Sequence, residues 1–252
     1  LISAMWVLGY FFTGRSLVKI RVSNLRPTWP VVSSIMAIGF APFALQMASS
    51  IQQLILNRTL WLHGGDLALS AVGIIGSIAT LLFMPVLGLA QGAQPIIGYN
   101  YGARQYKRVK ETWKISVLAG TAMALVGYAV IRLWPEQLIG LFSEGDTALT
   151  ALTAHAMLIF LAMIPLVGFQ IISSTYFQAV GKARQAAILS LSRQVLFFIP
   201  LLVFLPRIWG IEGVWRTAPI ADVLSIAFTA TLIYFEMKNL NQAQGSLETG
   251  DH

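Results

Sequence analysis

Long apolar runs separated by short polar segments constrain this chain more than any other feature of its sequence. One helix needs about 20 mostly apolar residues to cross the roughly 30 Å hydrocarbon core of a bilayer. The six runs of this length or longer are residues 30–57, 67–99, 112–134, 148–180, 183–206 and 213–237. A shorter run at residues 1–12 has the length of a helix end. The sequence therefore predicts an all-α, polytopic transmembrane helix bundle of six full spans plus the end of a preceding helix.

The charge content agrees with this prediction and excludes several functions. Only 11% of the residues are charged, against about 25% in soluble domains. The net charge of +7 sits in short clusters between apolar runs, which indicates the lipid bilayer as partner and no nucleic acid. There is no cysteine, and no phosphate-binding loop or metalloprotease motif occurs. We expect no catalytic residues, no bound cofactor and no metal site, so the protein is not predicted to be an enzyme.

Basic residues alternate between successive loops. One set of loops contains Arg15, Lys19, Arg21, Arg26, Arg104, Lys107, Arg108, Lys110, Lys114, Lys182, Arg184 and Lys238. The opposite set contains Arg58, Arg132, Arg207 and Arg216, together with Asp66, Glu136, Glu144, Asp146 and Glu212. The positive-inside rule makes the first set cytoplasmic. We therefore expect a multi-pass protein of the plasma (inner) membrane with a cytoplasmic C-terminus.

Three parts of the chain differ in composition. Residues 30–238 contain the six spans, and residues 239–252 are rich in polar and small residues, which predicts a disordered cytoplasmic tail. Residues 1–29 combine the helix end with a basic cytoplasmic linker, in which residues 13–29 form either an interfacial helix on anionic lipid or a plain loop. Because the chain opens inside an apolar run, we expect that a preceding N-terminal part is missing.

Two ionisable residues fall near the middle of predicted spans. Arg193 lies about ten residues into one span, and Asp222 lies about nine residues into the next, antiparallel one. A charge at mid-bilayer costs at least ~2.5–3.5 kcal/mol, so these residues require a partner or a function. We expect them to interact directly or through water, either as an ion-coupling site or as a structural pair. His155 lies nearer the end of its span, where it is either a proton relay or an interfacial residue.

Amide and hydroxyl side chains form two stripes on predicted helices. Gln46 and Gln53 are two helical turns apart and so share a face, with Ser49 and Ser50 between them. The second stripe contains Gln170, Ser173, Ser174 and Gln178. An unpaired amide is costly to bury in hydrocarbon. The stripes therefore line a water-filled cavity or form hydrogen bonds between helices in a closed core.

The segment at residues 84–110, MPVLGLAQGAQPIIGYNYGARQYKRVK, passes from an apolar run through glycine, proline and amides into a basic block. Its glycines allow close helix packing, and its proline frees a backbone carbonyl. The physics alone fits either helix packing with a termination signal or a functional site.

The run QGAQPIIGYNYGARQYKRV resembles the second-lobe signature of multidrug and toxic compound extrusion (MATE) transporters. Residues 189–202 (LSLSRQVLFFIPLL) and 218–225 (APIADVLS) resemble the last two helices of that family. The residues that match the signature are Gln91, Gly92, Gln94, Pro95, Gly98, Tyr99, Asn100, Tyr101 and Gly102. The resemblance covers nearly the whole chain and assigns these residues to packing and a helix end, not to substrate binding.

The resemblance implies one C-terminal lobe of a twelve-helix fold, whose partner is the missing N-terminal six-helix lobe. It implies secondary active efflux of cationic or neutral amphipathic drugs by alternating access, in exchange for H+ or Na+. The chain departs from some members, which have acidic residues on helices corresponding to residues 30–57 and 148–180. Sodium binding of that kind in this lobe is therefore not expected.

Three other functions remain open from the sequence. One is a flippase for lipid-linked oligosaccharides, which has a similar architecture, and the second is an intramembrane enzyme. The third is a non-transporting membrane receptor or scaffold, which the polar stripes and the glycine- and proline-rich segment disfavour. An anionic lipid-linked cargo would require several basic residues in the cavity, and only Arg193 is an obvious candidate. This difference favours a cationic or neutral cargo.

Overall fold

The computed structural model describes residues 5–6, 9–11, 28–143 and 146–249, and none of these residues forms a strand. The elements are α2 (Trp29–Gly102), α3 (Tyr106–Leu133), α4 (Pro135–Gly140), α5 (Thr147–Phe160), α6 (Ile164–Ala179), α7 (Ala183–Leu191), the π-helix η2 (Ser192–Phe198), α8 (Ile199–Trp209) and α9 (Ile211–Thr249). The chain divides into two compact units, Leu1–Ala44 and Leu45–His252. The candidate functional site lies in the second unit.

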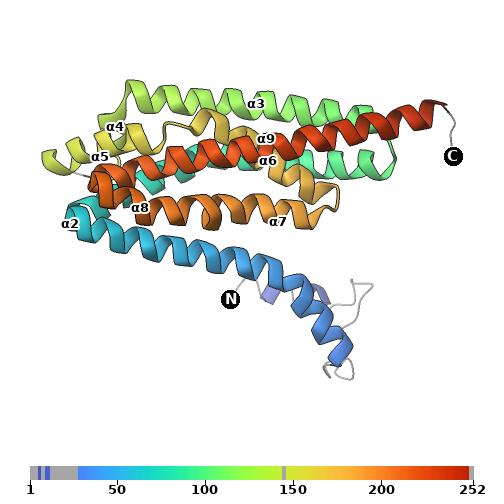
Figure 1. Ribbon diagram of the computed structural model, residues 1–252, viewed down its shortest axis with the longest axis horizontal. Coiled ribbons are helices and arrows are strands. Elements are labelled where there is room, and N and C mark those ends of the chain that lie inside the picture. The colour runs from blue at the N-terminus through green and yellow to red at the C-terminus, as the bar shows by residue number, and fades with distance from the viewer. Residues whose placement is uncertain (1–4, 7–8, 12–27, 144–145, 250–252) are drawn as a thin grey trace. The chain divides into compact units, whose positions relative to one another are not determined.

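Helix α2 is long because the loop predicted between its two halves is helical. The segment after residue 57 continues the helix, in which Thr59 Oγ1 donates to Ile55 O at 2.8 Å. The helix breaks only at Gly65, where φ is 62° and ψ is −158°. Glycine adopts this conformation without the steric penalty of a Cβ atom. Figure 1 shows the arm after Gly65 running back toward the start of α3.

Four helical segments are long and apolar enough to cross a membrane, and α5 with α6 forms a fifth as a pair bent by 53°. Pro165 lies in the first turn of α6, where a missing N–H is tolerated. The prediction of a helical membrane bundle is therefore confirmed. The sequence predicts six spans, whereas the structure has four, or five with the bent pair. The counts differ because the helical stretch before Gly65 joins two of the predicted spans into one helix.

The C-terminal segment differs from its prediction as well. Residues 239–249 continue α9 and are helical, whereas the sequence predicts disorder from residue 239. Lys110 Nζ on α3 donates to Asn241 Oδ1 at 2.6 Å and to Gln244 Oε1 at 2.9 Å. These contacts tie the end of α9 to a neighbouring helix, which explains why it stays folded. Residues 250–252 lie outside the described part of the chain.

The predicted linker is only partly described. Residues 5–6 and 9–11 are helical, and α2 begins at Trp29. Residues 12–27, which carry most of the predicted interfacial helix or loop, lie outside the described residues.

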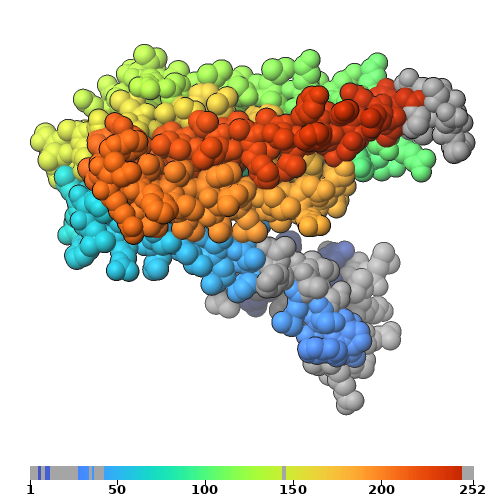
Figure 2. Space-filling model, viewed as in Figure 1, coloured from blue at the N-terminus to red at the C-terminus, as the bar shows by residue number. Residues whose placement is uncertain are grey.

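Two apolar clusters form the core of the second unit. The larger one surrounds Trp215, which is fully buried, and draws on α2 to α6, η2, α8 and α9. The smaller one surrounds Tyr176 and Phe177 and draws on α2, α3, α6, α7 and α9. Helix α9 contributes to both clusters, and Figure 2 shows it lying between α3 and the segment from α7 to α8. Helix α9 is therefore the central element of the unit.

The two ends of the second unit carry different charges. Figure 1 shows the α2–α3 turn, the α6–α7 turn and the end of α9 at one end, with α4 and the α8–α9 turn at the other. The first end carries basic residues such as Arg104 and Lys182, and the second carries acids such as Glu136 and Glu212. The fold thus keeps the predicted alternation of charge. Which end faces the cytoplasm stays a prediction.

Candidate functional site

A π-helical segment carries the arginine of the candidate site. Helix α7 widens into η2 at Ser192, and Arg193 and Gln194 are the residues that follow. Ser192 Oγ donates to Leu189 O at 3.0 Å within the same turn. Short π-helical segments are uncommon and frequently occur at functional sites because they change the direction in which side chains point.

Arg193 and Asp222 form a direct ion pair. Arg193 Nε donates to Asp222 Oδ1 at 2.8 Å. The Asp222 side chain is 7% exposed and the Arg193 side chain 33% exposed. A carboxylate this buried is stabilised only when a charged partner is adjacent. The pair links η2 to α9 near the middle of both predicted spans.

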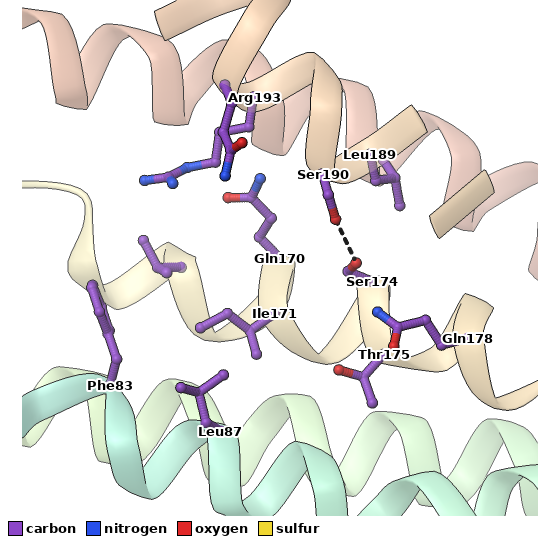
Figure 3. A pocket seen from close by; sticks show the side chains of 12 residues that line it. Phe83, Leu87, Gln170, Ile171, Ser174, Thr175, Gln178, Leu189, Ser190 and Arg193 are labelled. Carbon is purple, nitrogen blue, oxygen red and sulfur yellow. Dashed lines mark hydrogen bonds between the residues drawn. The ribbon is translucent and has the colours of Figure 1, made fainter. Parts of the chain in front are cut away.

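The first pocket, which we call the α6–α7 pocket, has a volume of about 310 Å³. Its lining residues are Phe83, Leu87, Val167, Gln170, Ile171, Ser174, Thr175, Gln178, Leu189, Ser190, Arg193 and Gln194. Figure 3 shows Gln170, Ser174 and Gln178 along α6, opposite Ser190 and Arg193. Ser174 Oγ lies 3.4 Å from Ser190 Oγ, and Gln170 Nε2 donates to Ser225 Oγ on α9. One wall is therefore polar, and Phe83 and Leu87 form an apolar wall.

The second pocket, the α2–α9 pocket, is larger, at about 620 Å³. Its lining residues are Gln52, Gln53, Leu56, Asn57, Leu69, Val72, Gly73, Ile75, Gly76, Ser77, Ala79, Thr80, Phe160, Arg193, Phe198 and Ala218. Gln53 Nε2 donates to Asn57 Oδ1 at 2.8 Å, and Thr80 Oγ1 donates to Gly76 O at 2.8 Å. Both arms of α2 thus contribute polar groups to this pocket.

The structure divides the predicted amide stripes. Gln53 lines the α2–α9 pocket, whereas Gln170, Ser174 and Gln178 line the α6–α7 pocket. Gln46 and Ser50 are exposed and lie outside both linings. Gln53 shares the face of Gln46 and is itself exposed, whereas the buried side of this helix follows Ala48, Gln52 and Leu56.

Both alternatives for the stripes occur together. Ser49 Oγ donates to Gln194 Oε1 at 3.2 Å, which is a hydrogen bond between helices. The sequence reasoning missed Asn57, Ser77, Thr80, Ser190 and Gln194 as lining residues. A usable signal existed for Gln194, because it adjoins Arg193 and a buried amide needs a partner. Ser77 and Thr80 gave little signal because hydroxyls are common inside membrane helices, where they bond their own backbone.

The family motif forms the last turns of α2. A Cβ atom at Gly98 would stand 3.0 Å from Ala179 O, so α2 and the end of α6 lie very close there. Asn100 is buried, its Nδ2 donates to Ile96 O at 2.8 Å, and its backbone oxygen accepts from Gln105 N at 2.9 Å. Arg104 completes the turn with φ of 58°.

Other members of the motif lie at the surface. The exposed members are Gln91, Gly92, Pro95, Tyr99 and Gly102, and Gln94 and Tyr101 are half-buried. None of the nine motif residues is among the lining residues of the two polar pockets. This geometry agrees with packing and helix termination, although Gly92 and Gly102 have no neighbour within 4 Å of an added Cβ.

Two further ion pairs use acids of α9. Glu236 accepts from Lys182 Nζ at 2.6 and 2.8 Å and from Tyr176 Oη at 3.1 Å, at the basic end of the unit. At the opposite end His155 Nε2 lies 2.7 Å from Glu212 Oε1, and both side chains are more than a third exposed. His155 is thus placed at the end of the bundle, away from both pockets.

Among the residues that the structure describes, no acid lines either pocket. Within the described ranges, no group of three or more His, Cys, Asp or Glu side chains is arranged to hold a metal ion. Both pockets offer amides, hydroxyls and one guanidinium beside apolar walls. Such surfaces bind small molecules of mixed polarity.

Comparisons with known proteins identify the family. The MatE family model matches residues 42–204. The multidrug export protein MepA of Staphylococcus saprophyticus is 24% identical over 250 residues, which cover 99% of this chain and 54% of that protein. MepA of Staphylococcus aureus is 24% identical over 237 residues, which cover 94% of this chain and 51% of that protein.

Solved structures give the same result. A structure of the MATE multidrug transporter DinF-BH is 38% identical, with a TM-score of 0.75, and covers 92% of this chain and 52% of that chain. The inward-facing conformation of a multidrug resistance MATE family transporter has a TM-score of 0.83 at 20% identity, over 96% of this chain and 56% of that chain. The chain thus spans about half the length of the relatives that it matches. Because the family model matches more than half of its residues, this membrane-spanning helical protein belongs to the MatE family.

Proposed function

We propose that the chain is one lobe of a MATE-type secondary transporter that exports cationic or neutral amphipathic compounds. The observation that carries the proposal is the pair of pockets of mixed polarity around a mid-span ion pair, inside a bundle whose outer surface is apolar. Their volumes, about 310 and 620 Å³, fall in the range of roughly 300–1,000 Å³ typical of small-molecule sites. The names of the relatives, multidrug export protein and multidrug transporter, support the same cargo class.

The proposed lobe has six spans within a twelve-helix protein. Six result when the two arms of α2 on either side of Gly65 are counted separately and α5 with α6 is counted as one bent span. The half-length match to the relatives supports a second, N-terminal lobe as partner. Transport would then proceed by alternating access, with the lobes rocking around a site between them. We place the protein in the plasma membrane with the basic end, and hence the C-terminus, in the cytoplasm.

Coupling to H+ or Na+ is the finer part of the proposal. The Asp222 carboxylate contacts Arg193, which lines both pockets. It either releases and takes up the coupling ion or serves as the fixed partner of Arg193, with coupling left to the other lobe. If an Asp222→Asn variant of the full-length protein still exported a compound against the concentration gradient of that compound, Asp222 would have only the structural role.

A flippase for lipid-linked oligosaccharides is the second candidate, and one observation weighs against it. Within the described part of the chain, Arg193 is the single basic residue that lines either pocket. A diphosphate-linked cargo carries several negative charges and would leave most of them uncompensated in these pockets.

Drug efflux by the full-length gene in a pump-deficient host tests the proposal. We expect cells that express the gene to expel amphipathic cations. This efflux should stop when the gradient of the coupling ion, which is H+ or Na+, is collapsed. Efflux that is indifferent to the separate collapse of both gradients would overturn the antiport mechanism. Absence of efflux for a broad panel of amphipathic compounds would overturn the cargo class.

A further inference from the structure

One edge of the Arg193 guanidinium has no partner among the residues that the structure describes. Its Nε donates to Asp222 Oδ1, and neither terminal nitrogen forms a hydrogen bond to any residue that the structure describes. The side chain is one-third exposed. Figure 3 shows its terminal nitrogens pointing away from Ser190 and Ser174. A guanidinium has five N–H donors in a rigid plane, so four of them remain available here.

The free edge lies where the two pockets meet. Arg193 is the only residue that lines both the α6–α7 pocket and the α2–α9 pocket, as far as the described residues extend. A ligand in either pocket can therefore reach the same guanidinium. The arginine is also held in place, because its Nε is fixed on a buried carboxylate and its backbone lies in η2.

The amides of Gln194 and Gln170 line the same pocket as the free edge, and Gln194 adds donors to it. Gln194 Oε1 already accepts from Ser49 Oγ, which leaves the amide N–H groups of Gln194 for the pocket. Gln170 Nε2 has one N–H engaged with Ser225. No described carboxylate belongs to either lining. A ligand that brings acceptor oxygens would satisfy these donors, and a carboxylate matches the planar fork of an arginine best.

Charge balance determines what else the ligand carries. Arg193 and Asp222 together are neutral, so a simple anion would bring an uncompensated negative charge into an apolar bundle. A zwitterion carries its own positive charge and avoids this cost. Phe83 and Leu87 on the opposite wall of the α6–α7 pocket provide apolar surface for the body of such a compound.

We propose that the free edge of Arg193 is a carboxylate subsite, and that the protein prefers zwitterionic amphipathic compounds to cations that lack the carboxylate. This inference rests on the proposed export function and narrows its substrate class. The α9 carboxylate acts as the positioning residue, since it holds the guanidinium by Nε and leaves the other edge to the ligand.

The test compares a carboxylated rhodamine dye with the ethyl ester of the same dye, in cells that express the full-length protein. The measured quantity is the ratio of acid efflux to ester efflux, which does not depend on the amount of folded protein. We expect the wild-type ratio to exceed one and to fall about ten-fold in Arg193→Lys, since lysine keeps the charge opposite Asp222 but has no second edge.

A second variant guards against misfolding. The double variant Arg193→Gln with Asp222→Asn removes both charges together and leaves no unpaired ion, and its ratio should fall to a similar extent. The matched control is Arg207→Lys, because Arg207 stacks on Phe204 outside both pockets, and its ratio should equal that of the wild type. A wild-type ratio of one or less, or a ratio that neither Arg193 variant changes, would overturn the subsite.

Binding separates failure of the subsite from failure of the export proposal. Fluorescence anisotropy on the purified full-length protein should show tighter binding of the acid than of the ester, and this difference should vanish in Arg193→Lys. If binding behaves in this way but neither dye leaves the cells, the subsite stands and the export function is wrong. If the ester is exported but the acid binds no better than the ester, the export function stands and the subsite is wrong.

Discussion

Helix α9 and the second arm of α2 lie in the same unit but are held by different forces. Helix α9 carries three acids, and each of them pairs with a base outside the helix. Glu212 pairs with His155 and Asp222 with Arg193. Glu236 pairs with Lys182, which lies just before α7. The arm of α2 after Gly65 forms no ion pair with any described residue, and its Ser77 and Thr80 hydroxyls donate to their own backbone. It is held by apolar packing and by the close approach at Gly98.

This difference reflects the environment of a membrane helix. Lipid is as apolar as leucine, so association within the bilayer depends on van der Waals packing and on polar contacts between helices. The three pairs fix α9 toward both ends and in the middle, while apolar packing holds the part of the α2–α9 pocket wall that the second arm of α2 provides. We therefore expect mutations on the two helices to change the stability differently. The loss should be largest at the central ion pair and smallest at the exposed one.

Removal of one partner of the central pair should have the largest effect. Arg193→Ala should cost about 3–5 kcal/mol of stability, because it leaves the buried Asp222 carboxylate unpaired. Asp222→Ala should cost less, since Arg193 is more exposed and can reach water. Thermal unfolding of the purified full-length protein in detergent measures both.

The double variant Arg193→Met with Asp222→Leu is the control for the central pair. It should recover most of the loss, because no buried charge remains. If both single variants were as stable as the wild type, the Arg193–Asp222 pair would not hold α9 in place. The middle of α9 would then be held by packing, as the second arm of α2 is.

The pair at the basic end should come second. Glu236→Gln keeps the shape of the side chain but removes the charge that Lys182 and Tyr176 contact, which should cost about 1.5–3 kcal/mol. Hydrogen exchange should also rise in the first turn of α7. Glu111→Gln is the matched control, since Glu111 is exposed on α3 and forms no ion pair with the residues described; equal losses in the two variants would refute the prediction.

Two glycines on α2 test the packing side of the comparison. Gly98→Ala should destabilise the protein by about 1–2 kcal/mol, because the new Cβ would press on the Ala179 carbonyl. Gly92→Ala, six residues earlier in open space, should stabilise it by up to about 1 kcal/mol through better helix propensity. If the Gly98 variant melted at or above the temperature of the Gly92 variant, the close approach of α2 to Ala179 would not limit the size of residue 98.

The exposed pair should matter least. His155→Gln removes the contact with Glu212, in which the two side chains are 56% and 37% exposed, so the loss should stay within about 0–1 kcal/mol. Higher salt should abolish even this difference in the melting temperature. A loss as large as that of Glu236→Gln would mean that burial does not separate this exposed pair from the two buried pairs of α9.

The sequence alone determined the membrane bundle, the charge difference between its ends and the family. Each of these depends on single segments, because a helix enters lipid according to its own length and hydropathy. The depth of Arg193 and of Asp222 also followed from their positions within predicted spans. The family motif was recognisable because its glycines, amides and proline occur together in one short run.

The tertiary structure decided which side chains meet. Successive residues of a helix differ by about 100° in direction, so Ser49 bonds Gln194 while Gln46 and Ser50 remain exposed. The pairing of each α9 acid with its base, and the meeting of two pockets at Arg193, depend on which helices are neighbours. Hydropathy fixes that a segment lies in the membrane, but only packing against other helices fixes its rotation and its partners.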